Sequence, residues 1–394
     1  MNITFGPLLE KDERMYRRFT ELLPSNNYQN LGWADKIWTS IARKDGSLQI
    51  GFGLGYYTNL ELMDAYAGVI TERSQHTIRS CRSTKKSLLE TKVGHISSGV
   101  SDKPNEVRFT LQDNESAAIA FDLKFSSDLP CFFEDRQLLR SAGSKCVVSD
   151  AIRYHQAGDV FGWVTVAGVR HEITPEEWFA FRDHSWGLRP DIGRIPESSD
   201  HETIAPIDSY TYLQLWCPIM FQRPDGSRYS VHFYIVMTEE KCIHFSGHIN
   251  YEDGSQDRAT NVRPELEYND HTRQPTGGRV HFDLQSGNTT TIEIMSLADS
   301  PGFHLGSGFH MGSRPYNSIE GRFYPLEEGG FYEEGDHTED VSSEDHNLRV
   351  YQLRDNIITA YHGDAEGYGF LQSIAYGVWP QLGLTNNAIY ACLD

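Results

Sequence analysis

The chain has 394 residues, a formal net charge of −20, and 39% hydrophobic and 12% aromatic residues. A chain of this length and hydrophobic content can bury a substantial core, which excludes disorder and makes two domains the natural expectation. The negative charge repels phosphate backbones, so nucleic acid is not expected as a partner.

The only helix that the sequence predicts lies near the start of the chain. Apolar residues recur at helical spacing between residues 8 and 23, and Pro24 then ends the pattern. We therefore expect one short N-terminal helix.

Beyond Pro24, short segments of alternating polar and apolar residues predict β-strands. Glycine, asparagine and aspartate stand at the breaks, as in the turn-forming segments 223–226 and 252–254. Nine such strands are predicted, at residues 48–54, 107–111, 117–125, 159–166, 210–215, 229–237, 242–249, 279–284 and 289–294. Short strands with little helix between them predict a mainly β fold of antiparallel sandwiches or barrels. We place the boundary where residues 171–177 interrupt the alternation, which gives domains 1–174 and 175–394.

One segment of the second half is strongly acidic. Residues 327–345 contain nine Asp or Glu and no Lys or Arg, and they lack the ligand spacing of a calcium loop. The composition is that of a solvent-exposed loop.

The sequence also bears on compartment and chemistry. The N-terminus lacks the basic segment and apolar run of a signal peptide, and the richest apolar stretch, residues 213–221, is far shorter than a membrane span. The six cysteines form no Cys-x-x-Cys pair, which argues against a redox motif or a dense disulfide framework. We expect a cytoplasmic protein without stable membrane insertion, and homo-oligomerisation stays open.

Two glycine-containing segments superficially resemble common functional motifs but do not match their residue spacing. Residues 51–55 are glycine-rich, but no helix follows and the spacing does not match a dinucleotide loop. Residues 306–308 lack the pattern of a nucleophile elbow. Neither a nucleotide cofactor nor serine acylation is therefore expected.

Histidines on two predicted strands raise the question of a metal. His244 and His248 share parity on one strand and His232 lies on a neighbouring one, so a third ligand could meet two of them across a sheet. Histidine is also an ordinary polar residue on half-buried strands, and no further ligand follows at metal-site spacing. We expect no metal at these three residues and no other cofactor.

The most informative segment is residues 178–189, Trp-Phe-Ala-Phe-Arg-Asp-His-Ser-Trp-Gly-Leu-Arg. Burying Arg182, Asp183 and His184 in an aromatic run is costly unless each is paired or has a function. In an extended strand, Asp183 lies on the face opposite Arg182. Among apolar groups its carboxyl would have a raised pKa and could act as a general acid. The alternative is an Arg–Asp ion pair that anchors the end of a strand.

Residues 182–187, Arg-Asp-His-Ser-Trp-Gly, resemble the Asp-His-x-Trp-Gly signature of the carotenoid 1,2-hydratase/hydroxyneurosporene synthase-like (AttH-like) superfamily, in particular its uncharacterised bacterial branch. Residues 153–162 are similar to the Tyr-x-Gln-x-Gly-x-x-x-Gly stretch of that branch, although His155 replaces an expected acidic residue. The resemblance implies two lipocalin-like β-domains packed side by side, with a hydrophobic pocket near their junction and no metal or nucleotide.

These observations give a leading hypothesis and two alternatives. The first is a cofactor-independent enzyme (a hydro-lyase or a cyclase/isomerase) that acts on an isoprenoid, steroid-like or polyene molecule by acid-assisted hydration or dehydration, cyclisation or isomerisation. The alternatives are a non-catalytic carrier of an apolar ligand, and a carbohydrate-active protein with two acidic side chains about 5–10 Å apart in one cleft.

The leading hypothesis gives roles to eight residues. Asp183 is the proton donor, His184 orients or relays, and Arg182 pairs locally and contributes to substrate binding. Aromatic side chains then form the walls of the substrate pocket, namely Tyr154, Trp163, Trp178, Phe181 and Trp186.

Overall fold

The computed structural model describes most of the chain and is almost entirely β. Strands make up 71% of the described residues and helical turns 3%, which confirms the mainly β prediction. The helix predicted at residues 8–23 is not confirmed: η1 (Glu10–Glu13) is a short 3-10 turn, and residues 16–23 lie outside the described part. The described residues are 10–15, 32–71, 74–84, 90–101, 105–115, 118–140, 147–189, 211–270, 272–297, 302–305, 331–340 and 353–386.

The first sheet contains fourteen strands, in the order β21-β4-β3-β2-β1-β13-β11-β8-β7-β6-β5, with β9, β10 and β12 also paired to β11. Each strand pair is antiparallel. Its strands are β1 (Trp33–Arg43), β2 (Leu48–Tyr57), β3 (Leu62–Thr71), β4 (Ser74–Ser83), β5 (Lys92–Val93), β6 (Ile96–Val100), β7 (Glu106–Leu111), β8 (Ile119–Ser126), β9 (Phe132–Phe133), β10 (Gln137–Arg140), β11 (Val147–Val166), β12 (Val169–Ile173), β13 (Trp178–Leu188) and β21 (Phe331–Asp340).

The second sheet closes into a barrel, because β19 pairs with β22 as well as with β18. Its order is β19-β18-β17-β16-β15-β14-β23-β22-β20. The strands are β14 (Tyr212–Gln222), β15 (Arg228–Met237), β16 (Cys242–Tyr251), β17 (Gln256–Tyr268), β18 (Pro275–Leu284), β19 (Thr289–Ser296), β20 (Phe303–His304), β22 (Arg354–His362) and β23 (Ala365–Tyr376). Short 3-10 turns follow β2 of the first sheet, at η3 (Thr58–Leu60), and β23 of the second, at η6 (Pro380–Leu382).

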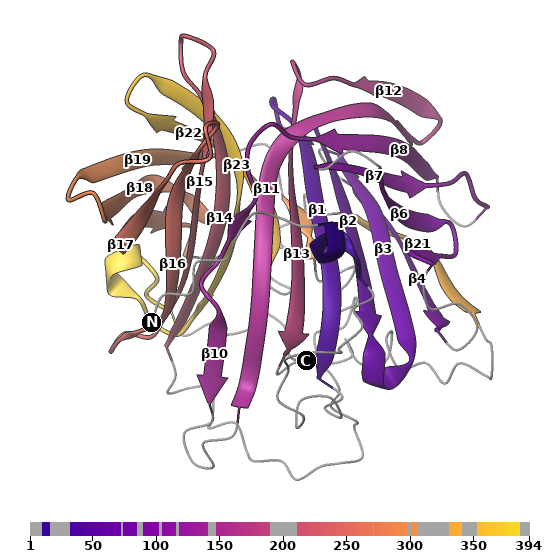
Figure 1. Ribbon diagram of the computed structural model, residues 1–394, viewed down its shortest axis with the longest axis horizontal. Coiled ribbons are helices and arrows are strands. Elements are labelled where there is room, and N and C mark those ends of the chain that lie inside the picture. Colours follow the sequence, from indigo (N-terminus) through magenta and orange to yellow (C-terminus); the bar gives the residue numbers. More distant parts are fainter. Residues whose placement is uncertain are drawn as a thin grey trace.

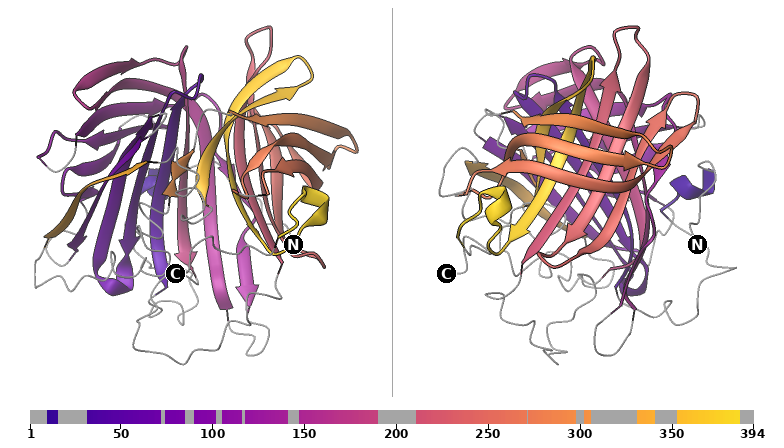
Figure 2. Two further views of the ribbon diagram at one scale, coloured as in Figure 1. Left: turned by 180° about the vertical axis from the view of Figure 1, so that it is seen from behind. Right: turned by 90° about the vertical axis from the view of Figure 1, so that its left-hand side faces the viewer.

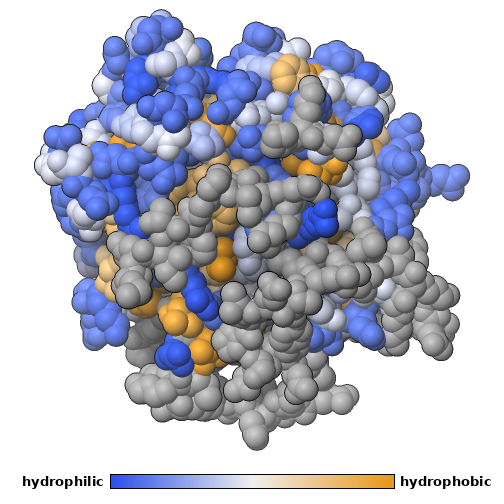
Figure 3. Space-filling view, in the orientation of Figure 1, coloured by the Kyte–Doolittle hydropathy of each residue, from blue (hydrophilic) through white to orange (hydrophobic). Residues whose placement is uncertain are grey.

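The two sheets lie side by side, and β11 and β13 of the first face β14 and β23 of the second (Figures 1 and 2). Each sheet encloses its own apolar core, to which β2 and β8 contribute in the first and β15 and β18 in the second. In the view of Figure 3, the outer strands are mostly hydrophilic and hydrophobic residues gather between the two halves. The prediction of two antiparallel barrel-like units is confirmed.

The division between the sheets differs from the predicted boundary at 174/175. Strand β13, which that boundary assigns to the second domain, pairs with β1 and β11 in the first sheet, and the change of sheet comes between Leu188 and Tyr212. Within the interruption at residues 171–177, residues 171–173 are the end of β12 and residues 174–177 are the turn to β13. The break in the alternation of polar and apolar residues therefore corresponds to a turn within the first sheet and not to the division between the two sheets.

The acidic segment also differs from its prediction. Residues 331–340 form β21, which pairs with the edge strand β4 of the first sheet instead of forming a loop. The neighbouring strand carries Arg79 and Arg82, which stand opposite Glu334 and Phe331 in the register. Backbone pairing with an open sheet edge outweighs the composition of the segment, while residues 327–330 and 341–345 lie outside the described part.

Gly187, at the end of the 182–187 motif, occupies a position that excludes any side chain. Its φ is +134°, and a Cβ atom there would lie 2.1 Å from the carbonyl oxygen of Asp150 on β11. We expect Gly187→Ala to lower the free energy of unfolding by about 2–3 kcal/mol, because strain and a backbone clash combine. Urea unfolding of the variant and the wild type measures this difference in free energy. Gly254→Ala is the control, since Gly254 has a φ of +81° but open space around it; equal losses in both variants would contradict the steric explanation.

Candidate functional site

Strand β13 presents its charged residues on two opposite faces, as the alternation predicts. Arg182 and His184 point to the interior of the first sheet, where Trp178 belongs to the core. Phe181 points to the second sheet, where its ring centroid lies 5.9 Å from that of Phe370 on β23. Asp183 shares this second face. The segment therefore contributes to two separate polar clusters.

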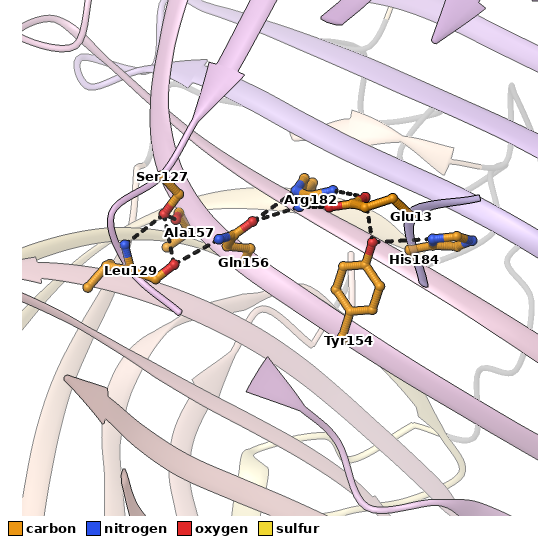
Figure 4. Close-up of polar contacts among 8 residues, drawn as sticks. All are labelled: Glu13, Ser127, Leu129, Tyr154, Gln156, Ala157, Arg182 and His184. Carbon is orange, nitrogen blue, oxygen red and sulfur yellow. Dashed lines mark hydrogen bonds and ion pairs between the residues drawn. The ribbon is translucent and has the colours of Figure 1, made fainter. Parts of the chain in front are cut away.

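The interior cluster consists of Glu13, Asp35, Tyr154, Gln156, Arg182 and His184. Arg182 donates from Nη1 and Nη2 to the two carboxylate oxygens of Glu13, at 2.8 and 2.7 Å, and also donates to Gln156 Oε1 (Figure 4). The hydroxyl of Tyr154 donates to Glu13 Oε2 at 2.8 Å. Despite burial, these donors lower the pKa of the Glu13 carboxyl.

His184 extends this network toward β1. Its Nε2 lies 2.6 Å from Asp35 Oδ1, and its Nδ1 lies 3.3 Å from the Tyr154 hydroxyl. Asp35, Tyr154 and His184 are each at most 2% exposed. His184 is therefore held between a carboxylate and a phenol on the face opposite Asp183, so it does not relay protons to Asp183 by direct contact.

The junction cluster consists of Glu134, Arg153, Asp183 and Asp355, between the two sheets. Arg153 Nε lies 2.9 Å from Asp183 Oδ2, and its Nη1 lies 3.2 Å from Glu134 Oε2. The guanidinium of Arg153 thus forms ion pairs with two buried carboxyl groups. Desolvation by burial raises the pKa of both Asp183 and Glu134, against the lowering effect of Arg153.

Asp355 is the second sheet's contribution to this cluster. It is fully buried, and it accepts hydrogen bonds from Trp38 Nε1 of the first sheet at 3.2 Å and from Gln372 Nε2 at 2.6 Å. Desolvation raises the pKa of the Asp355 carboxyl to about 7, and the negative charge of Asp183 adds to this increase. The junction therefore contains carboxyl groups that hold protons at higher pH than exposed ones.

Three histidines surround Phe132 next to the junction cluster: His155 on β11, His232 on β15 and His248 on β16, with ring centroids 4.6, 5.4 and 4.1 Å from that of Phe132. The rings of His155 and His232 lie 3.7 Å apart. Desolvation lowers the pKa of all three, to about 3 for His248, so their imidazoles are neutral near pH 7. Glu134 reaches this histidine cluster, with Oε1 3.3 Å from His232 Nε2.

The five aromatic residues predicted as pocket walls do not share one site. Tyr154 belongs to the interior cluster and Trp178 to the first core, whereas Phe181 packs at the junction. Trp186 packs edge-on against His184 with ring centroids 5.4 Å apart. Trp163 lies on the β11–β12 hairpin under Arg170 and lines an open surface cleft of about 690 Å³, away from Asp183.

The residues that sequence reasoning missed come from other segments. Glu134 follows Phe132-Phe133, and Asp355 stands at the start of the apolar strand β22. A charged residue next to an apolar run is the same signal that singled out Asp183, and it was available for both. Nothing local, however, indicated that these residues would meet Arg153.

The fold and the two clusters define a mainly antiparallel β protein with a buried ionisable site between its halves. The chain belongs to a family of unknown function (DUF8625), whose model matches residues 24–385. A search of curated proteins finds no match.

Three solved structures are similar over most of the chain. A Nitrosomonas europaea protein described as an AttH has 12% identity and a TM-score of 0.48, covering 93% of this chain and 99% of that one. Kievitone hydratase from Nectria haematococca has 10% identity and a TM-score of 0.46, covering 90% and 93%. CghA, crystallised with Sch210972, has 11% identity and a TM-score of 0.47, covering 93% and 96%. At this level of identity, these similarities assign no activity to the chain.

No helix in the described ranges is both long and apolar enough to cross a bilayer.

Proposed function

We propose that this protein is an enzyme that acts on a hydrophobic small molecule, such as an isoprenoid, steroid-like or polyene compound, by acid-assisted hydration or dehydration, cyclisation or isomerisation. Asp183 is the proton donor. The observation that carries the proposal is the burial of Asp183 between the sheets, 9% exposed, where desolvation raises its pKa and Arg153 is shared with Glu134.

The surroundings of Asp183 suit this chemistry. Trp38 stands opposite Asp183 in the β1–β13 register, and its ring packs edge-on against Trp216 and Phe370 at 5.1 and 6.2 Å. Aromatic faces stabilise a carbocation once a substrate displaces part of this packing. Asp355, hydrogen-bonded to Trp38, adds a second buried carboxyl, whose own pKa is raised by desolvation and by the charge of Asp183.

The proton transfer can be written for a hydration. The O–H bond of the neutral Asp183 carboxyl breaks, and the alkene's π electron pair forms a C–H bond with the released proton. Water attacks the resulting carbocation through oxygen and returns one proton to the carboxylate. Dehydration is the reverse sequence. In a cyclisation an internal alkene replaces water as the nucleophile, and the cyclised carbocation then loses a proton from carbon to the Asp183 carboxylate.

Asp183→Asn tests the assignment, because the amide keeps the shape but has no acidic proton to donate. We expect turnover to fall by about 10²-fold or more with a nearly unchanged melting temperature. The assay incubates a panel of isoprenoid and polyene alkenes and tertiary alcohols in H₂¹⁸O or D₂O and measures isotope incorporation by mass spectrometry. Wild-type turnover should fall as the pH rises through the raised pKa of Asp183.

Asp122→Asn is the matched control, since Asp122 also pairs with an arginine, Arg108, but on the exposed side of the first sheet. It should retain wild-type turnover. A folded Asp183→Asn variant with wild-type turnover would contradict the role of Asp183. Saturable binding of panel compounds without isotope incorporation by the wild type would favour the carrier function instead.

A further inference from the structure

The histidine cluster has a geometry that the proposed acid chemistry does not use. Glu134 Oε1 lies 3.3 Å from His232 Nε2 and 4.0 Å from His155 Nε2, and one ligand atom from each of these residues lies within 4.8 Å of the other two. Bonds of about 2.0–2.1 Å to a tetrahedral metal ion place two ligand atoms about 3.3–3.4 Å apart. The Glu134–His232 pair already has this spacing, and the Glu134–His155 distance exceeds it by less than about 1 Å.

The hydrogen bonding of the histidines indicates a missing partner. His155 Nε2 and both ring nitrogens of His232 are buried and make no hydrogen bond within the described residues. His155 and His232 are only 4% and 2% exposed. A buried polar atom without a partner costs about 1–3 kcal/mol, so several in one place are not expected from packing alone.

Glu134 is oriented as metal-binding carboxylates usually are. Trp216 Nε1 donates to its Oε1 at 2.6 Å, which leaves a second lone pair on that oxygen, and Arg153 holds Oε2 at 3.2 Å. Such outer contacts fix the direction of a ligand. Asp183, 2.9 Å from Arg153 Nε, also balances the charge of Arg153.

We propose that Glu134, His155 and His232 form a binding site for a first-row divalent cation such as Zn²⁺, with coordinate bonds from Glu134 Oε1 and the two Nε2 atoms. Two histidines and one glutamate are a ligand set that zinc accepts, and three protein ligands leave a fourth position for water or substrate. His248, opposite His232 on β16, lies next to this set without belonging to it. The proposal reverses the sequence-based expectation of no metal at His232.

The first test is metal binding by the full chain, expressed without an affinity tag and stripped with a chelator. Calorimetric titration with Zn²⁺ should give one site per chain, and Co²⁺ should give the visible absorption bands of a tetrahedral complex. His232→Phe and His155→Phe keep a ring of similar volume, and each should weaken Zn²⁺ binding by about 100-fold or more. Circular dichroism of the metal-free variants checks their folding.

The matched control is His281→Ala, because His281 also faces a glutamate, Glu265 at 3.2 Å, but on the exposed side of the second barrel. It should bind Zn²⁺ like the wild type. The proposal is overturned if the wild type binds no stoichiometric metal, if the phenylalanine variants bind like the wild type, or if the control loses as much affinity as they do.

X-ray absorption of the Co²⁺-loaded wild type provides a readout that needs no variant. Two imidazoles with oxygen ligands are expected, and a sulfur ligand would overturn the assignment. These measurements record binding and not turnover, so their outcome is independent of the role proposed for Asp183.

Discussion

Replacing Arg182 with methionine is expected to lower the free energy of unfolding by about 3–5 kcal/mol. Arg182 is 3% exposed and forms two hydrogen bonds with Glu13 and two with Gln156. Without the guanidinium, the Glu13 carboxylate stays buried with the Tyr154 hydroxyl as its remaining donor among these groups. The decrease in the free energy of unfolding therefore reflects the uncompensated buried charge of Glu13. Such a charge costs far more free energy than an exposed ion pair contributes.

A double-mutant cycle separates this explanation from loss of packing. Glu13→Gln in the Arg182→Met background removes the stranded charge, and it should recover much of the lost stability. The pair's contribution also depends on pH: the pKa of Glu13 is lowered in the folded state, so the stabilisation is present above its ordinary value of 4.5 and is lost as the pH falls further.

Urea unfolding at pH 7 and at pH 4 measures both effects. Arg279→Met is the control, because Arg279 forms an exposed pair with Glu293 and should contribute at most about 1 kcal/mol. Strictly additive losses in the double variant would show that Arg182 acts through packing and not through its charge.

Asp355→Asn is expected to change how stability depends on pH. The folded state raises the pKa of Asp355 from 3.8 to about 7. Between these values the folded chain binds more protons than the unfolded chain, so the contribution of Asp355 to stability falls as the pH rises from about 4 to about 7. At 1.36 kcal/mol for each pH unit, the full difference is about 4 kcal/mol. Asp355→Asn has no titrating carboxyl at this position, so its stability lacks this pH-dependent contribution.

Urea unfolding of wild type and variant from pH 4 to pH 8 tests the expectation. The stability of Asp355→Asn relative to the wild type should increase by about 4 kcal/mol over this range. Asp253→Asn is the control: Asp253 is an exposed turn residue whose pKa is lowered by hydrogen bonds from Ser255, so its effect has the opposite sign. Parallel curves for wild type and Asp355→Asn would contradict a raised pKa.

Local patterns in the sequence located several strands and turns and the two faces of β13. Alternation located β7 and β19 because a half-buried strand must direct every second side chain to the core, and it also located β2 and β15, which are largely buried on both faces. Segment 223–226 forms the turn it predicts, with Gly226 at a φ of +88° and Asp225 accepting from the backbone of Ser227. Strand parity likewise separated Asp183 from Arg182. These properties depend on neighbours in the chain, so a local pattern contains them.

Which charged residues meet depends on the tertiary structure. Glu13 reaches Arg182 across 169 positions of the chain, and Trp38 reaches Asp355 across 317. Composition describes 331–340 as a loop, yet the open edge of β4 makes it a strand. His232 acquires Glu134 and His155 as neighbours because β15 faces the first sheet, and no spacing along one strand contains that information. Charged residues and histidines within apolar segments are recognisable in the sequence. Their partners depend on sheet order and on the packing of the two sheets, which long-range contacts alone establish.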